Sequence, residues 1–134
     1  MGSFDFSFDE DFIKSLGTLA EVEQYAPKMI DEALPIIEKH LTANLRSHKV
    51  SGDLIGSIKI KKSKRAKNGG FFGSVFPSGQ SSDGTTNAEK LVYLEYGTSH
   101  QPSTGILAKA VQESTDEVNA KMQKVFEREA LKGL

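Results

Sequence analysis

The sequence predicts an α+β fold in which two long helices pack on a small antiparallel β-sheet, with a mixed sheet as the alternative. Apolar residues recur at steps of three and four in residues 19–47 and again in 106–131, which predicts two amphipathic helices. Between them, residues 58–61 alternate apolar and basic side chains, and a returning strand follows over 70–76. The turn residues Asn68-Gly69-Gly70 join these two strands into a predicted hairpin.

The chain begins with phenylalanines that alternate with polar residues at Phe4, Phe6 and Phe8. This alternation is typical of a short strand or of a docking tail. A helical turn or two is expected from Asp9 to Leu16, ended by Gly17. We expect residues 1–17 to be a flexible N-terminal segment of a single domain that spans residues 1–134.

The first long helix is predicted over 19–47, and two prolines interrupt its sequence. Because a proline inside a helix costs about 3 kcal/mol, we expect the helix to start near Pro27 and to kink or break at Pro35. Gly52 is the expected stop signal. Its apolar stripe consists of Met29, Ile30, Ala33, Leu34, Ile37, Leu41 and Leu45.

After a short helical turn at 53–57, the middle of the chain is expected to hold the hairpin and two mobile loops at 62–70 and 77–90. The second loop is rich in serine, glycine and threonine. Residues 88–96 fit a strand about as well as a short buried helix. Ser103 or Thr104 is the expected cap of the last helix, which runs from Ile106 to Leu131.

Composition limits the classes of protein that this chain fits. The 134 residues include no cysteine, which excludes disulfides and thiolate metal sites, and 37% are hydrophobic, which predicts long polar loops. No stretch reaches the roughly 20 apolar residues of a membrane span. The acidic, aromatic start lacks the basic region and apolar run of a signal peptide. We therefore expect a protein that is made in a cytoplasm and used there or in a particle assembled there, with no membrane partner.

Charge is distributed unevenly along the chain. Residues 1–38 hold nine acidic and two basic side chains, whereas residues 39–67 hold nine basic side chains and one acidic one. Faces of opposite sign suit head-to-tail self-association or binding of nucleic acid.

Side chains in a catalytic arrangement are not evident, and we expect no enzyme activity, no cofactor and no metal site. His40 and His48 lie about two helical turns apart, and His100 follows Ser99 directly, which rarely sets up proton transfer. Glu95 lies among apolar residues. Its leading interpretation is a carboxylate that hydrogen-bonds the following Gly-Thr-Ser turn. The alternatives are an intersubunit ion pair and a catalytic role, in a small hydrolase that uses Glu95 or His100.

Six basic residues within nine positions form the most concentrated charge in the chain. They are Lys59, Lys61, Lys62, Lys64, Arg65 and Lys67. The interpretations are a solvated hairpin tip, a contact with an acidic protein or a neighbouring copy, and a contact with DNA. A small nucleic-acid-binding module that uses residues 59–67 is the alternative function. Phe71 and Phe72 are expected in the strand core.

Three segments resemble one protein family, in the family's order. Residues 51–58 (SGDLIGSI) resemble a small-residue turn ahead of a strand. Residues 88–99 end in Tyr93-Leu94-Glu95-Tyr96-Gly97-Thr98-Ser99, which resembles the family's apolar-Glu-aromatic-Gly-Thr-Ser block. Pro102 and residues 106–111 are similar to the start of its final helix, with Ser103-Thr104-Gly105 in place of an arginine-proline-aromatic stretch. The family is that of the neck or tail-completion (tail-to-head joining) proteins of long-tailed bacteriophages and prophages.

This resemblance implies a structural protein of the virion neck. It implies a ring of copies, expected to be a hexamer, that completes the head-proximal end of the tail and joins it to the head. The implied partners are the tail tube protein and the head connector or stopper proteins, with DNA present only in transit through the channel. The motif residues Tyr93, Glu95, Tyr96, Gly97, Thr98 and Ser99 are expected to hold the frame, with both tyrosines in the core.

Overall fold

The computed structural model describes residues 4–6, 19–48 and 52–132, and its helices and strands confirm the α+β class. The elements follow in the order β1 (Phe4–Phe6), α2 (Leu19–Ser47), α3 (Gly52–Gly56), β2 (Ile58–Arg65), β3 (Phe71–Pro77), α4 (Asn87–Tyr96) and α5 (Ile106–Lys132). The helical turn expected from Asp9 to Leu16 lies outside the described residues. So does most of the segment 1–17 that was predicted to be flexible.

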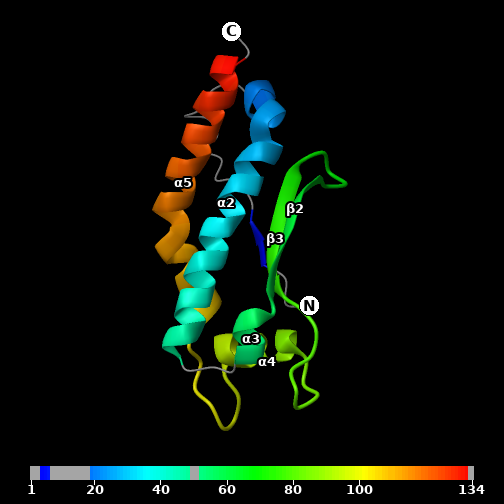
Figure 1. Ribbon diagram of the computed structural model, residues 1–134, viewed down its shortest axis with the longest axis vertical. Coiled ribbons are helices and arrows are strands. Elements are labelled where there is room, and N and C mark those ends of the chain that lie inside the picture. Colours follow the sequence, from blue (N-terminus) through cyan, green and yellow to red (C-terminus); the bar gives the residue numbers. More distant parts are fainter. Residues whose placement is uncertain (1–3, 7–18, 49–51, 133–134) are drawn as a thin grey trace.

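The long helix α2 is the central layer of the fold. Figure 1 shows α2 between α5 on one side and the β2–β3 hairpin on the other. The predicted sheet and two long helices are present, with α2 packed directly on β2 and β3 and with α5 making its main contacts with α2. The short helices α3 and α4 lie at the end of the molecule where α2 ends and α5 begins (Figure 1).

The sheet has three antiparallel strands in the order β1-β3-β2, so β3 is central and β2 lies at an edge. Phe4 pairs with Val75 and Phe6 with Gly73, so this part of the predicted alternation is a strand, and Phe8 lies outside the described residues. In β2, the register shifts between Lys61, opposite Ser74, and Lys64, opposite Phe72. Two steps along β3 thus correspond to three along β2, which is a β-bulge.

The α2 helix runs without a break from Leu19 to Ser47 and contains both prolines. The helical range is confirmed, whereas the expected start near Pro27 and a break at Pro35 are wrong. Pro35 is exposed, so its ring faces solvent while its neighbour Leu34 is fully buried. Burial of the apolar stripe on both sides of the prolines offsets the helix hydrogen bonds that they remove.

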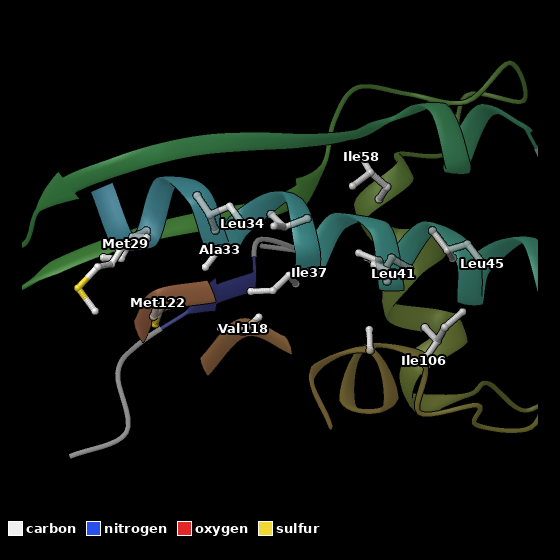
Figure 2. Close-up of a cluster of buried hydrophobic side chains, with 14 of the residues drawn as sticks. Met29, Ala33, Leu34, Ile37, Leu41, Leu45, Ile58, Ile106, Val118 and Met122 are labelled. Atoms are coloured by element: carbon white, nitrogen blue, oxygen red, sulfur yellow. The ribbon is translucent and has the colours of Figure 1, made fainter. Parts of the chain in front are cut away.

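The core forms on both sides of α2 and contains the whole predicted stripe. In Figure 2, Leu34 lies toward the strands, whereas Ala33 and Ile37 lie toward Val118 and Met122 of α5. The central strand contributes a glycine to this contact. A Cβ atom on Gly73 would lie 2.7 Å from Leu34 Cδ1, so only glycine lets β3 approach α2 this closely.

The loops that were predicted at 62–70 and 77–90 are shorter than expected. Residues 62–65 continue β2, residue 77 ends β3, and residues 87–90 form the first turn of α4. The strand extends because Ser63 is tied to α2, with its N–H donating to Asp31 Oδ1 at 2.7 Å and its hydroxyl to the Pro27 carbonyl at 3.2 Å. Mobility of the remaining loop residues stays a prediction.

Ion pairs join α2 and α5 beside the apolar contact. Glu129 of α5 is buried and accepts hydrogen bonds from Lys28 of α2 at 3.0 Å, from Arg128 and from Lys132. These cations, Lys28 first, lower the pKa of Glu129 from 4.5 to about 2. Arg128 also binds Glu32 across the helix pair, which lowers the pKa of Glu32.

The Glu129 cluster predicts a specific loss of stability in acid. Because the folded state holds this pKa below its ordinary value, the contribution is complete above pH 4.5 and is lost as pH falls toward 2. We expect the difference in unfolding free energy between the wild-type protein and Glu129→Gln to shrink across this window in urea titrations. Glu113→Gln, which removes an exposed carboxylate of the same helix, is the matched control.

Candidate functional site

The motif segment forms helix α4 and the turn that leads into α5. Thr86 caps α4, because its side chain accepts a hydrogen bond from the Glu89 N–H. Thr86 and Glu89 have the spacing of a capping box, which is a sequence signature of a helix start. The structure therefore resolves the strand-or-helix ambiguity of residues 88–96 in favour of a helix.

Glu95 caps the long helix α5 from outside that helix. Its buried carboxylate accepts hydrogen bonds from the N–H of Leu107 at 2.7 Å and the N–H of Ala108 at 3.5 Å. Gly105 precedes the helix and has no side chain to cap it, so Glu95 supplies the missing acceptor at the positive end of the helix dipole. The expected partner of Glu95, the Gly-Thr-Ser turn, is corrected to the first turn of α5.

The loop between α4 and α5 folds back on the end of α4. Thr104 donates to the Leu94 carbonyl through both its N–H and its hydroxyl, and the Ser103 hydroxyl donates to the Glu95 carbonyl. These two residues were expected to cap α5, and they instead satisfy the last carbonyls of α4. Gly97, with φ of 80°, makes the reversal between the two helices.

The two tyrosines of the motif lie on the surface. Tyr93 is 44% exposed and Tyr96 is 75% exposed, so the prediction that both lie in the core is wrong. The helical period explains the difference, because Leu91 and Glu95 are four residues apart and share the buried face of α4. The motif thus has an inner side that connects two helices and an outer side that presents aromatic surface.

A groove of about 570 Å³ adjoins Tyr93. It lies between the end of β3, the following loop and α4, and it is lined by Pro77, Gly79, Gln80, Thr86, Ala88, Glu89, Val92 and Tyr93. Sequence reasoning missed this groove. The capping-box spacing of Thr86 and Glu89 was the available signal, because it defines the helix and hence the side on which Val92 and Tyr93 lie.

The loop that forms one wall of the groove is fixed by hydrogen bonds. Asn87 is buried, accepts from the Ser81 hydroxyl at 2.6 Å and donates to the Ser78 carbonyl at 2.8 Å. The N–H and hydroxyl of Ser82 both donate to Asp53 in α3, which lowers the pKa of Asp53. These contacts connect the loop to the two short helices.

The six predicted basic residues extend along β2 and its turn. All six residues are exposed, and three of them also lie over aromatic rings. Lys61 Nζ lies 5.2 Å from the Phe76 ring centre, Lys64 Nζ 5.2 Å from that of Phe72, and Arg65 Cζ 4.7 Å from that of Phe71. Both phenylalanines are half-buried: Phe71 packs against the core as expected, whereas Phe72 lies beneath a lysine.

The remaining candidates for chemistry are dispersed. His40 contacts Glu117 across the helix pair at 3.1 Å, and His48 and His100 are exposed. Within the described ranges, no three histidine or carboxylate side chains gather as a metal site would require. None of the helices in this part of the chain is long and apolar enough to cross a membrane.

Removal of the Glu95 cap should weaken the joint between α4 and α5. We expect Glu95→Ala to lower the unfolding free energy by about 2 kcal/mol, because it deletes a helix cap and leaves the N–H groups of Leu107 and Ala108 without this acceptor. Glu95→Gln keeps an acceptor oxygen and should lose less. Urea unfolding measures both, and Glu113→Ala on the exposed side of α5 is the control, with a change within about 0.5 kcal/mol. An equal loss in the alanine and glutamine variants would contradict the capping role.

Comparison with known protein families, with curated protein sequences and with solved structures finds no match to this chain.

Proposed function

We propose that this chain is a structural subunit that completes the head-proximal end of a long phage tail and joins the tail to the head. The observation that carries the proposal is the Glu95-Tyr96-Gly97-Thr98-Ser99 block at the junction of two helices. It resembles the tail-completion family in sequence, and its parts divide into framework and surface. Glu95 and Gly97 connect α4 to α5, while Tyr96 and the nearby Tyr93 face outward.

The outward side of α4 has the composition of an assembly surface. Tyrosine is enriched in protein interfaces because it buries a large apolar ring and keeps a polar hydroxyl. Tyr93 also borders the groove of about 570 Å³, which offers concave apolar surface next to a projecting aromatic one. We propose a second copy of the chain as the occupant, because a ring requires two different faces of each subunit to meet.

The other proposed partners follow from the position of such a ring. One face of the ring contacts the tail tube protein, and the opposite face contacts the head connector or stopper proteins. The proposed ring is a hexamer in the virion neck, and it assembles in the host cytoplasm. In this proposal the chain acts without catalysis and without a cofactor.

The test is complementation in the phage or prophage that encodes the chain. Without the protein, we expect filled heads and free tails to accumulate unjoined in electron micrographs, and the wild-type gene to restore joined particles. Normal particles in its absence would overturn the proposal. So would heads that fail to fill, because that defect precedes joining.

A surface variant tests the tyrosine face separately. We expect Tyr93→Ser combined with Tyr96→Ser to leave the monomer folded and to abolish both ring formation and joining. Leu131→Ser is the matched control, since Leu131 is also a large apolar residue, 67% exposed, and lies near the end of α5 away from the groove. Sedimentation and circular dichroism report assembly and folding. Equal assembly of both variants would remove the tyrosine face from the proposal.

A further inference from the structure

The outer face of the β2–β3 hairpin carries a row of lysines over phenylalanine rings. Lys59 pairs with Phe76, Lys61 with Ser74 and Lys64 with Phe72, and paired residues share one face of a sheet. The opposite face is fixed by Gly73 and Val75, which pack toward α2. The three lysines therefore lie on the side of the hairpin that faces away from α2. Figure 1 shows this hairpin projecting beside the helix pair.

The β-bulge is what brings the third lysine onto this face. Alternation along a regular strand would place Lys59, Lys61 and residue 63 on one side. The extra residue between Lys61 and Lys64 shifts the alternation, so Ser63 turns toward α2 and Lys64 turns outward. The two hydrogen bonds from Ser63 to Asp31 and Pro27 hold the bulge in place. β-Bulges commonly re-aim a side chain in this way, and they are regular features of protein structure and not defects.

The cations of the hairpin lack the acidic partners that most cations elsewhere have. Lys28, Lys39, Lys90, Lys121, Arg128 and Lys132 each form an ion pair. None of the six basic residues of the hairpin does so with a described side chain. Residues 54–82 contain no aspartate or glutamate at all. Within the hairpin itself, this face therefore carries basic residues and no acidic one.

We propose that this face, the lysine row of Lys59, Lys61 and Lys64 over Phe72 and Phe76, binds the phosphate backbone of nucleic acid. Because the face is positively charged, its partner is expected to be a polyanion. The arrangement of the aromatic rings distinguishes nucleic acid from an acidic protein. An acidic protein would need an apolar centre to its interface, whereas here the ammonium groups of Lys61 and Lys64 cover the ring faces. The covered rings also exclude base stacking as the main contact, so the site reads charge and not sequence.

The row provides several positive charges in series along one strand. Lys59 and Lys61 are two residues apart, which is about 6.7 Å on a strand, and each strand of duplex DNA carries one negative charge per about 3.4 Å of helix axis. Contacts between lysine and phosphate release condensed counterions, so affinity depends steeply on salt. Three such contacts give a slope of log K against log salt of about −2.7.

The site is independent of the proposed joining role, and its test needs only the purified full chain. Fluorescence anisotropy with a labelled duplex of about 20 base pairs, and with one of its single strands, measures affinity between about 50 and 200 mM NaCl. We expect the duplex to bind at least as tightly as the single strand, two unrelated duplex sequences to bind equally, and affinity to fall about 40-fold over this salt range.

A pair of variants with the same net charge locates the site. Lys61→Gln combined with Lys64→Gln should reduce the salt slope by about 2 units. Lys109→Gln combined with Lys124→Gln removes two exposed lysines of α5 that have no ion pair with a described side chain, and it should change the slope little. The proposal is overturned by absence of duplex binding at low salt, by equal losses in the two variants, or by a clear preference for single strands. A variant that loses joining in phage particles but still binds DNA would bear on the proposed role of the tyrosine face and not on the DNA-binding proposal.

Discussion

Gly97→Ala is expected to destabilise the protein by roughly 4 kcal/mol, among the largest effects of any single methyl group in the described part of the chain. Gly97 has φ of 80° and ψ of 173°, a backbone region that is accessible essentially only to glycine. A Cβ atom at this position would also lie 2.7 Å from the Ser103 nitrogen and 2.9 Å from the Gln101 carbonyl oxygen. Both neighbours are backbone atoms, so no side chain can rotate away to make room.

The size of the expected loss follows from these two costs. Backbone strain contributes about 1 to 3 kcal/mol, and forced displacement of the loop contributes about 1 to 3 kcal/mol more. Displacement of residues 101–103 also disturbs the bonds that Ser103 and Thr104 make to the last carbonyls of α4. The same substitution should therefore expose the α4–α5 joint to hydrogen exchange before the rest of the fold opens.

Gly79→Ala is the matched control for Gly97→Ala. Gly79 also has a positive φ, 67°, yet a Cβ atom there would meet nothing within 4 Å. Its expected cost is therefore the backbone strain alone, about 1 kcal/mol. Urea unfolding of both variants separates strain from steric collision. Equal losses of unfolding free energy at the two positions would show that the close approach of residues 101–103 does not contribute to the cost of Gly97→Ala.

Much of the fold could be predicted because its long elements have strong periodic signals. The stripe from Met29 to Leu45 predicted the body of the first long helix but not its start at Leu19, and the stripe of the last helix predicted its range from Ile106 onward. The predictions of a start near Pro27 and a break at Pro35 failed, because burial of about seven apolar side chains outweighs the two hydrogen bonds that the prolines remove. The side on which α5 packs was not predictable from its own sequence, since an apolar stripe does not identify its partner.

The candidate site was harder to predict, because its residues interact across distant parts of the chain. The bond from Glu95 to Leu107 and Ala108 spans 12 and 13 residues, and no local pattern indicates it. Tyr93 and Tyr96 were placed in the core because they lie in a largely apolar run that fits a strand about as well as a short buried helix. The cap at Thr86 decides for a helix and turns both tyrosines outward.

The basic cluster was visible in the sequence, whereas its arrangement was not. Six bases within nine positions predict a charged surface for any secondary structure. Which lysines share a face depends on the bulge after Lys61, and the bulge depends on Ser63 meeting Asp31 in the preceding helix. A contact of this kind between positions 32 residues apart requires the assembled fold.

The contact between Leu34 and Gly73 carries the second large effect, because it sets the distance between α2 and the sheet. Leu34 is fully buried, so Leu34→Ala should cost about 2 to 5 kcal/mol through lost burial and the cavity left behind. Gly73→Ala adds volume to the same place. Its Cβ atom would lie 2.7 Å from Leu34 Cδ1 and 2.8 Å from Ile30 Cγ2, which predicts an overpacking cost of about 1 to 3 kcal/mol.

The two substitutions should partly compensate each other, since one empties the space that the other fills. We expect Gly73→Ala to cost at least about 0.5 kcal/mol less in the Leu34→Ala background than in the wild-type protein. Compensation stays incomplete because the contact with Ile30 remains.

Leu41→Ala is the control. Leu41 is also fully buried in the α2 stripe but lies seven residues, roughly 10 Å, further along the helix. Its cost should add to that of Gly73→Ala within about 0.5 kcal/mol. Additive costs for Leu34 and Gly73 in urea unfolding would mean that the sheet moves away from α2 as a unit and that this contact does not fix their separation.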